Sequence, residues 1–412
     1  MLGTTTLLGV RSLPSTTGRV EAECNGSSPT ALKGPGSVVV NFWYAPSREI
    51  PTEDPMPRPI SCAVFMTFVL ALLSAACTRQ APAPGAEAQP PVVDKSRLAV
   101  FAPLPASVPG AAGAPSEEMV TLGRMLYYEP RLSKSQTISC NTCHDLAKYG
   151  VDGEPTSDGH KGQTGTRNSP TVFNAAAHFA QFWDGRAVDV EEQAKGPVVN
   201  PIEMAMPGES AVVAVLESMP EYVDLFEKAF PNDKKPVTYD NMAKAIGAFE
   251  RKLMTPSRWD ALLGGDQNAL TPAETVGLRT FLDAGCQTCH SGALLGGTSY
   301  QRLGAVRPHP NAADLGRYGV TKNQADKAVF KVPSLRNVEK TGPYYHDGTV
   351  TSIEQAVRDM AEYELGKTLT HEQTTEIVEF LKVLTGRIDD EYIKPPVLPK
   401  STAKTPKPDI SN

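Results

Sequence analysis

Two short motifs of the same pattern constrain this 412-residue chain more than any other feature of its sequence. Residues 140–144 read CNTCH and residues 286–290 read CQTCH, so each is a C-x-x-C-H motif. This pattern is typical of covalently attached haem, because the two thiols add to the porphyrin vinyl groups and the adjacent histidine ligates the iron. The sequence therefore predicts two covalently bound c-type haems, each held by one cysteine pair and one proximal histidine: Cys140, Cys143, His144, Cys286, Cys289 and His290.

Other uses of these four cysteines explain the pattern less well. A zinc ribbon would place its two cysteine pairs about 15–20 residues apart, much closer than they are here. A thioredoxin-like C-x-x-C motif would need a βαβ context, whereas helical patterns dominate this chain. Disulfides would suit an exported protein, but they leave the histidine after each pair unexplained. Two haems are the better interpretation.

The first 110 residues carry targeting signals rather than a fold. Residues 60–77, ISCAVFMTFVLALLSAAC, form an uncharged apolar run that is typical of a signal peptide and predicts export to the periplasm. We expect Met56 to be the true start, residues 1–55 to be a leader that is not part of the natural protein, and residues 56–77 to be the signal peptide. The end of the run fits ordinary cleavage and a lipoprotein site equally, so a lipid anchor at Cys77 stays open. Residues 78–110 are predicted to be a Pro/Ala-rich linker.

Helical signals dominate the remainder of the chain. Apolar residues recur at helical spacing behind an N-cap or capping-box residue, and no alternating run is long enough for a sizeable sheet. The predicted caps are Ser116, Thr271 with Glu274, Thr351 with Glu354, and Thr370 with Gln373. The expected fold class is mainly α. The net charge of −6 argues against non-specific nucleic-acid binding.

Sixth iron ligands decide whether each haem carries electrons or reacts. His160 lies in the glycine-rich stretch 158–170, DGHKGQTGTRNSP, where the glycines predict a movable loop. It is a candidate displaceable ligand for the first haem, although a solvated loop histidine would look the same. Met360, in a predicted helix after His290, is a candidate ligand for the second haem, with a core methionine as the alternative. A thioether ligand would raise that haem's reduction potential.

Eight motifs in order make the chain resemble the bacterial di-haem cytochrome c peroxidases from about Pro115 to Arg387. They are SCNTCHD, DGHKGQTGTRNSPTVFN, FWDGRA, NPIEM, GCQTCH, PSLRNV, TGPYYHDG and MAEYELG. The resemblance implies two cytochrome c-like haem domains in one chain, with a calcium site between them. It places the peroxidatic domain at residues 111–253 and the electron-transfer domain at residues 254–387. The tail, residues 388–412, is expected to pack on the first domain.

The resemblance also implies roles for individual residues of the first domain. His144 would be the proximal ligand of a low-potential peroxidatic haem, and His160 its displaceable distal ligand. Trp183 would lie between the haems on the electron route, while Gln193 and Glu203 would form the peroxide pocket. Peroxide cleavage needs a group that takes one proton and returns it to the distal oxygen, and a carboxylate such as that of Glu203 can do so.

The second domain would hold the high-potential haem through His290 and Met360, with His346 nearby in the inter-domain region. The resemblance assigns the calcium ion to the Asn168 side chain and to the Thr341 and Pro343 carbonyls, together with waters. Oxygen ligands of this kind suit a hard cation.

The implied activity is reduction of hydrogen peroxide to water by a cytochrome-c peroxidase. Electrons would come from a small cytochrome c or a blue-copper protein, and the resemblance implies a homodimer. Two alternatives stay open. A MauG-type maturation enzyme has a tyrosine where Met360 stands, and Tyr363 lies one turn away. A di-haem electron carrier without peroxide chemistry would not need Glu203, Gln193 and Trp183.

Overall fold

The computed structural model describes residues 93–411 apart from residues 112 and 311–312. The expected leader, signal peptide and Cys77 therefore lie outside the described residues. Within them the chain is mainly helical, as predicted, and its strands form a two-stranded antiparallel sheet in which Tyr300 is opposite Lys331. None of the described helices is long and apolar enough to cross a membrane.

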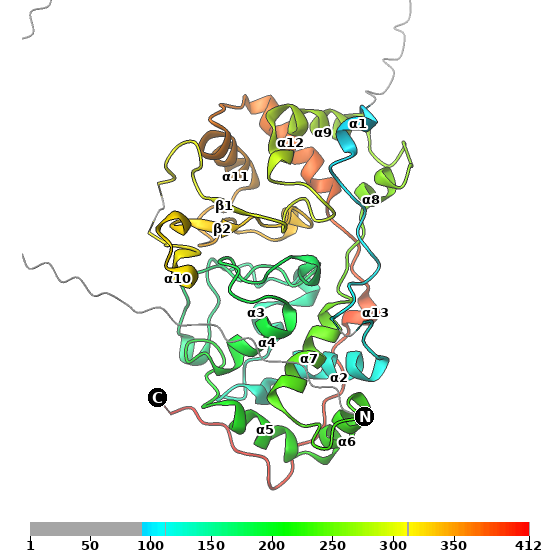
Figure 1. Ribbon diagram of the computed structural model, residues 1–412, viewed down its shortest axis with the longest axis vertical. Coiled ribbons are helices and arrows are strands. Elements are labelled where there is room, and N and C mark those ends of the chain that lie inside the picture. The colour runs from blue at the N-terminus through cyan, green and yellow to red at the C-terminus, as the bar shows by residue number, and fades with distance from the viewer. Residues whose placement is uncertain (1–92, 112, 311–312, 412) are drawn as a thin grey trace, which may run out of the picture. The chain divides into compact units, whose positions relative to one another are not determined.

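Figure 1 shows the order of the elements along the chain. The α-helices and strands have these bounds: α1 Lys95–Leu98, α2 Glu117–Tyr127, α3 Cys140–Cys143, α4 Val190–Val199, α5 Glu209–Glu217, α6 Pro220–Ala229, α7 Tyr239–Glu250, α8 Arg258–Leu263, α9 Pro272–Ala284, β1 Tyr300–Arg302, α10 Tyr318–Thr321, β2 Val329–Lys331, α11 Ile353–Asp359, α12 His371–Val383 and α13 Asp390–Ile393. Short 3₁₀ turns connect many of them, and α11 continues directly into a π-helical segment, η8 Met360–Glu364.

Three of the four predicted helix starts are confirmed by their caps. The Ser116 side chain accepts a hydrogen bond from the Met119 amide at the start of α2, and Thr271 and Thr370 form capping boxes at the starts of α9 and α12. The fourth prediction was wrong by one residue. Ser352, not Thr351, caps α11. Its hydroxyl oxygen accepts a hydrogen bond from the Gln355 amide, and the hydroxyl itself donates to the Glu354 carboxylate.

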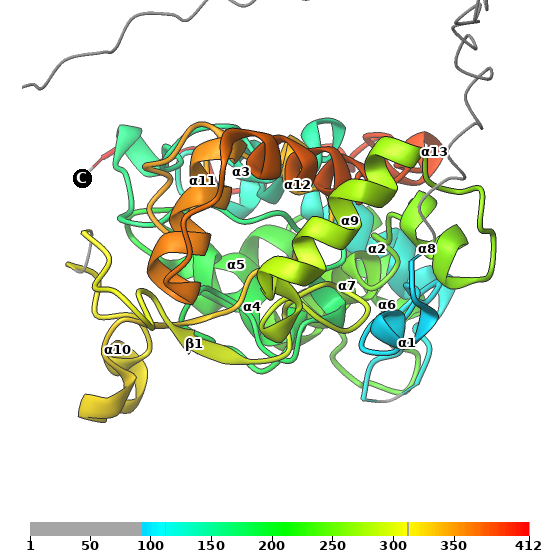
Figure 2. The same cartoon turned by 90° about the horizontal axis from the view of Figure 1, so that it is seen from above.

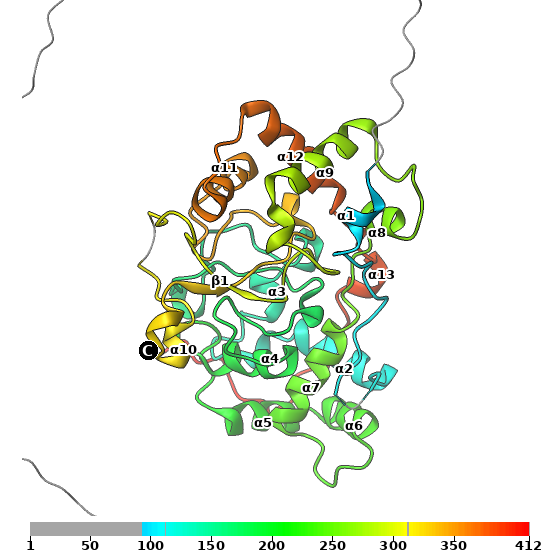
Figure 3. The ribbon, with the colours of Figure 1, turned by 45° about the horizontal axis from the view of Figure 1, so that its top comes forward.

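Buried apolar side chains gather in two separate clusters. The first is formed mainly by α2 and α4–α7, and α2 packs along α7. The second surrounds Trp259 of α8 and includes the facing sides of α9 and α12, which lie side by side in Figures 2 and 3. Close helix contact in the second cluster depends on Gly277, because a Cβ there would lie 2.0 Å from the Glu376 carbonyl oxygen.

The segment expected as a linker is built into the fold from residue 93 onward. It forms the short helix α1 and then buries Phe101 edge-to-face against Trp259, with the ring centroids 5.1 Å apart. The Leu104 amide donates to the Asp260 carboxylate at 2.7 Å. The Pro/Ala composition hid this contact, because a single aromatic anchor leaves no periodic pattern.

The last residues of the chain run along the first cluster. Tyr392 of α13 stacks on Phe249 at 5.0 Å between ring centroids. Farther on, Arg131 donates to the Ser401 hydroxyl and the Pro399 carbonyl, and the Thr402 hydroxyl donates to the Ser218 carbonyl.

Candidate functional site

The histidines of the two C-x-x-C-H motifs are oriented by backbone carbonyls. Nδ1 of His144 lies 3.4 Å from the Gly150 carbonyl oxygen, and Nδ1 of His290 lies 3.1 Å from that of Leu295. A proton on Nδ1 that bonds a carbonyl leaves Nε2 free as a metal ligand, and metal-ligating histidines usually donate their other ring N–H in this way. Burial lowers the pKa of both rings, which favours the neutral form that binds iron. The donor sets therefore fit proximal haem ligands.

The side chain of His160 is buried without a hydrogen-bond partner. It is 4 % exposed, and among the described residues neither Nδ1 nor Nε2 has a partner. Its backbone amide is well held, because it donates to the carbonyls of Ile202 at 3.1 Å and Glu203 at 2.7 Å. Buried ring nitrogens are rarely left unpaired, so an iron ligand role fits this side chain.

The glycines of the His160 loop have different structural roles. Gly162 has φ +69°, the left-handed conformation that glycine tolerates best. Gly159 is required for close approach instead, since a Cβ there would lie 1.9 Å from the Ile202 carbonyl oxygen. Nothing lies within 4 Å of a Cβ built on Gly165. The sequence predicted a movable loop around His160, whereas the structure fastens the first half of this loop to residues 202–203.

Glu203 follows α4, is half-buried, and is joined to the His160 amide through its backbone carbonyl. Burial raises the pKa of the Glu203 carboxyl, while Arg186 and a hydrogen bond from Asn200 partly oppose that rise. Arg186 lies over the Phe182 ring at 3.4 Å and bonds Asp184, which holds its charge in place. Gln193 lies half-buried on α4. A half-buried carboxyl with a raised pKa has the chemistry that a proton-transfer group needs.

Trp183, Asn168 and His346 meet at one point, although they are far apart in the sequence. The Trp183 indole N–H donates to the Asn168 carbonyl at 2.9 Å, and the Asn168 amide donates to the His346 carbonyl at 2.8 Å. The rings of Trp183 and His346 meet edge-to-face at 6.5 Å. A bond from the Lys331 amide to the Trp183 carbonyl, 2.8 Å, links this group to β2.

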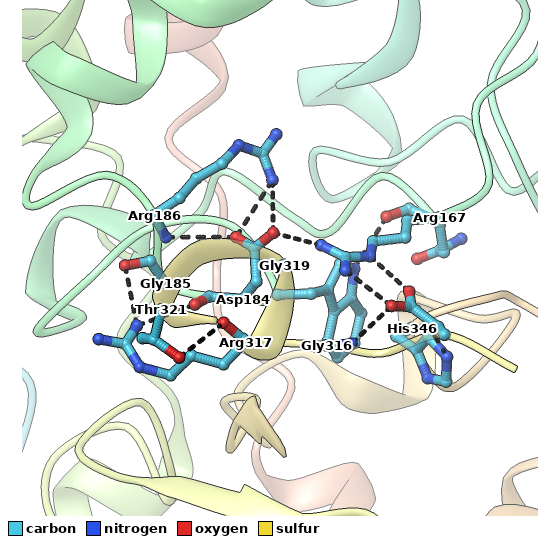
Figure 4. Close-up of polar contacts among 12 residues, drawn as sticks. Arg167, Asp184, Gly185, Arg186, Gly316, Arg317, Gly319, Thr321 and His346 are labelled. Carbon is cyan, nitrogen blue, oxygen red and sulfur yellow. Dashed lines mark hydrogen bonds and ion pairs between the residues drawn. The ribbon is translucent and has the colours of Figure 1, made fainter. Parts of the chain in front are cut away.

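A charged network beside Trp183 was not found by sequence reasoning. Arg167 bridges Asp184 and Asp314 with N–O distances of 2.6 Å to each, and His346 Nε2 lies 3.9 Å from Asp314 (Figure 4). Arg317 donates to the carbonyls of Asp184 and Gly185. The charged residues of this network lie in loops and form no recognisable motif, so the sequence carries no signal for it.

Met360 is the first residue of the π-helical segment η8. Such segments are rare and are frequently found at functional sites. Tyr363 lies in the same segment, where its carbonyl accepts hydrogen bonds from the amides of Val306 and Arg307 at 3.0 Å. The Tyr363 ring packs edge-to-face on His309 at 4.9 Å.

The residues expected to bind calcium lie along neighbouring loops. A groove of about 390 Å³ is lined by eight residues, including Pro155 and Pro343. Thr341 ends the 3₁₀ turn Val338–Lys340, directly before the Gly342–Pro343 bond. The Asn168 side chain donates to the Glu154 carbonyl at 3.0 Å, so it lies next to one wall of this groove.

Comparison with known proteins identifies the class to which this fold and site belong. A family model of di-haem cytochrome c peroxidases matches residues 117–268. Cytochrome c551 peroxidase from Pseudomonas aeruginosa is 47% identical over 328 residues, covering 78% of this chain and 94% of that protein. Cytochrome c551 peroxidase from Nitrosomonas europaea is 48% identical over 292 residues, covering 70% of this chain and 86% of that protein. The methylamine utilization protein MauG from Paracoccus denitrificans is 34% identical, covering 63% and 80%.

Solved structures agree on the fold. A MauG-like protein associated with microbial copper homeostasis matches with a TM-score of 0.62 and 28% identity, covering 71% of this chain and 97% of that one. The di-haem peroxidase BthA from Burkholderia thailandensis matches with a TM-score of 0.56 at 21% identity, covering 72% and 91%. The chain belongs to the di-haem cytochrome c peroxidase family. It is a cytochrome-c peroxidase, an oxidoreductase that uses two haem groups.

Proposed function

We propose that this protein reduces hydrogen peroxide to water with single electrons from a small periplasmic cytochrome c or blue-copper protein. The observation that carries the proposal is that the backbone of His160, whose buried imidazole is unpaired, is bonded at 2.7 Å to the backbone carbonyl of Glu203, a half-buried residue whose carboxyl pKa is raised. A plain electron carrier has no use for a proton-transfer group at this place.

The chain would hold two covalent haems through the cysteine pairs and His144, His290, His160 and Met360. When bound, these groups supply the peroxide-binding iron and the stored electron. Glu203 accepts a proton from the bound peroxide and returns it to the distal oxygen, so that water leaves. Gln193 orients the peroxide by hydrogen bonding without titrating, and His160 moves aside to admit it. Met360, not Tyr363, is the ligand in this proposal, which favours peroxidase over MauG-type chemistry.

Peroxide-dependent oxidation of a reduced cytochrome c tests this function. We expect two donor molecules oxidised per peroxide and no oxygen release, because two electrons and two protons convert peroxide to two waters. The assay uses holoprotein with both haems attached, and catalase-treated peroxide serves as the blank. Donor oxidation at the rate of the blank would contradict the proposal and leave the electron-carrier interpretation.

Electron transfer between the two haem sites would pass near Trp183. A calcium ion held by Asn168, Thr341 and Pro343 would fix the positions of the loops around Trp183. We expect Trp183→Phe and calcium chelation each to slow the decay of the reduced high-potential haem after mixing with peroxide. Stopped-flow absorbance of the half-reduced protein measures this decay. Tyr318→Phe is the control, since its hydroxyl accepts a hydrogen bond from the exposed Gln324 side chain. Unchanged decay in both perturbed samples would overturn the route and the calcium role.

Export and assembly complete the proposal. We infer a periplasmic protein that begins at Met56 before processing, either released or anchored by lipid at Cys77, and that forms a homodimer. N-terminal sequencing of the mature protein tests the first inference, because residues from before Met56 would contradict it. Mass photometry of the holoprotein tests the second.

A further inference from the structure

A buried lysine and histidine form a pair outside the site described above. Lys331 of β2 is 7 % exposed, and its Nζ lies 2.5 Å from Nδ1 of His178. The other ring nitrogen of His178, Nε2, is buried and has no hydrogen-bond partner among the described residues. The pair thus presents one ammonium group and one unused ring nitrogen in the interior.

No carboxylate in the described part of the chain forms an ion pair with Lys331. Burial alone lowers the pKa of Lys331 to about 7. A buried ammonium is costly unless an anion accompanies it. The site therefore lacks the negative partner that its chemistry requires.

The pair adjoins the segment that orients His290. The Phe179 amide, next to His178, donates to the Gly297 carbonyl at 3.1 Å, and the Gly297 amide donates to the Val332 carbonyl, next to Lys331, at 2.8 Å. A Cβ on Gly297 would lie 2.7 Å from the His178 ring. Leu295 lies in the same segment, residues 294–297, and its carbonyl accepts the hydrogen bond from Nδ1 of the His290 ring.

The proton on His178 can be assigned from its neighbour. The Lys331 ammonium only donates, so Nδ1 of His178 must accept. Burial and the Lys331 charge lower the pKa of His178 well below its usual value, so the ring is neutral and its proton sits on Nε2. Nε2 of His178 and the remaining N–H groups of Lys331 are then donors on opposite sides of the imidazole ring, and each can bond a carboxylate oxygen.

We propose that Lys331 and His178 bind the propionate carboxylates of the haem held by His290, one at the Lys331 ammonium and the other at Nε2 of His178. This rests on the proposed pair of covalent haems, because the propionates are carboxylates that the haem held by His290 would bring with it, and the pair adjoins the segment that orients His290. The contact raises the reduction potential of that haem, since neutralising a propionate charge favours the iron form with one positive charge less. Lys331 and His178 are positioning and tuning residues, and they support the electron-storing role given to Met360.

Potentiometry of the holoprotein tests the proposal. Haem content and covalent attachment are measured first by pyridine haemochrome spectra and mass spectrometry. Each haem's midpoint is then read by spectroelectrochemistry at pH 6 in Lys331→Met, Lys331→Arg and His178→Asn. Lys327→Met is the matched control, because this exposed lysine precedes β2. Resonance Raman bands of propionate bending are recorded on the same samples.

We expect Lys331→Met to lower the midpoint of the high-potential haem, Lys331→Arg to restore most of it, and Lys327→Met to leave it unchanged. His178→Asn should shift the propionate bending bands while both haems stay attached. An unchanged midpoint with unchanged Raman bands in Lys331→Met and His178→Asn would overturn the proposal, as would a shift confined to the other haem. If Lys331→Met does not fold, His178→Asn decides alone. Absence of covalent haem from the parent protein would instead refute the proposed function.

Discussion

Replacing Glu203 with glutamine is expected to lower kcat/KM for hydrogen peroxide by about 10²–10⁴, the usual contribution of a general acid–base group. Glutamine keeps the shape and the hydrogen-bonding capacity of the side chain but cannot accept and return a proton. Because the bond that joins residue 203 to the His160 amide comes from the backbone carbonyl, which glutamine also has, both haem spectra should stay as in the parent protein. Steady-state peroxide turnover with a reduced cytochrome c measures the loss.

The pH profile sharpens this prediction. Burial raises the Glu203 pKa, so in the parent protein the carboxylate is protonated progressively as the pH falls through that raised value. Activity that needs the carboxylate as a base must then decline on the acid side, and the glutamine variant should lack this acid limb. Glu192→Gln is the control, because Glu192 also belongs to the α4 region but forms only an exposed ion pair with Lys195. Unchanged turnover in Glu203→Gln with intact haem spectra would support an electron carrier.

The features of this protein that its sequence predicts are those that depend on residues close together in the chain. The haem motifs are contiguous, and the capping boxes of α9 and α12 depend on residues three apart. Residues of the His160 loop were found by their motif, but the contact between Gly159 and Ile202 was not. It joins two loops whose approach is set by the whole chain.

Polar contacts between residues far apart in the chain could not be predicted from the sequence for the same reason. Arg167 meets Asp314 across 147 positions, and Lys331 meets His178 across 153. Each partner alone looks like an ordinary surface charge. Similarly, Phe101 lies in a segment with a linker composition, and its burial follows from its contact with Trp259. These pairings are decided by tertiary packing, which local patterns do not encode.

Replacing Gly159 with alanine should release the His160 loop from its resting position. The new Cβ would lie 1.9 Å from the Ile202 carbonyl oxygen and 2.9 Å from the Glu203 Cα, both parts of the backbone that cannot rotate away. Overpacking of this kind costs about 1–3 kcal/mol, and the His160 amide bonds to these carbonyls would weaken with it. A cost of that size shifts a two-state loop equilibrium by about 5–150-fold. His160 would then leave its buried position in a larger fraction of molecules.

Electron paramagnetic resonance of the fully oxidised holoprotein measures this release, because loss of a sixth ligand converts a low-spin haem to high spin. We expect Gly159→Ala to show an increased high-spin signal and peroxide binding without prior reduction. Gly165→Ala is the matched control, since it lies in the same loop and a Cβ there meets nothing within 4 Å. An unchanged low-spin signal in Gly159→Ala would mean that the contact with residues 202–203 does not hold His160 in place. This pair of variants therefore tests whether the contact with residues 202–203 holds the His160 loop in its resting position.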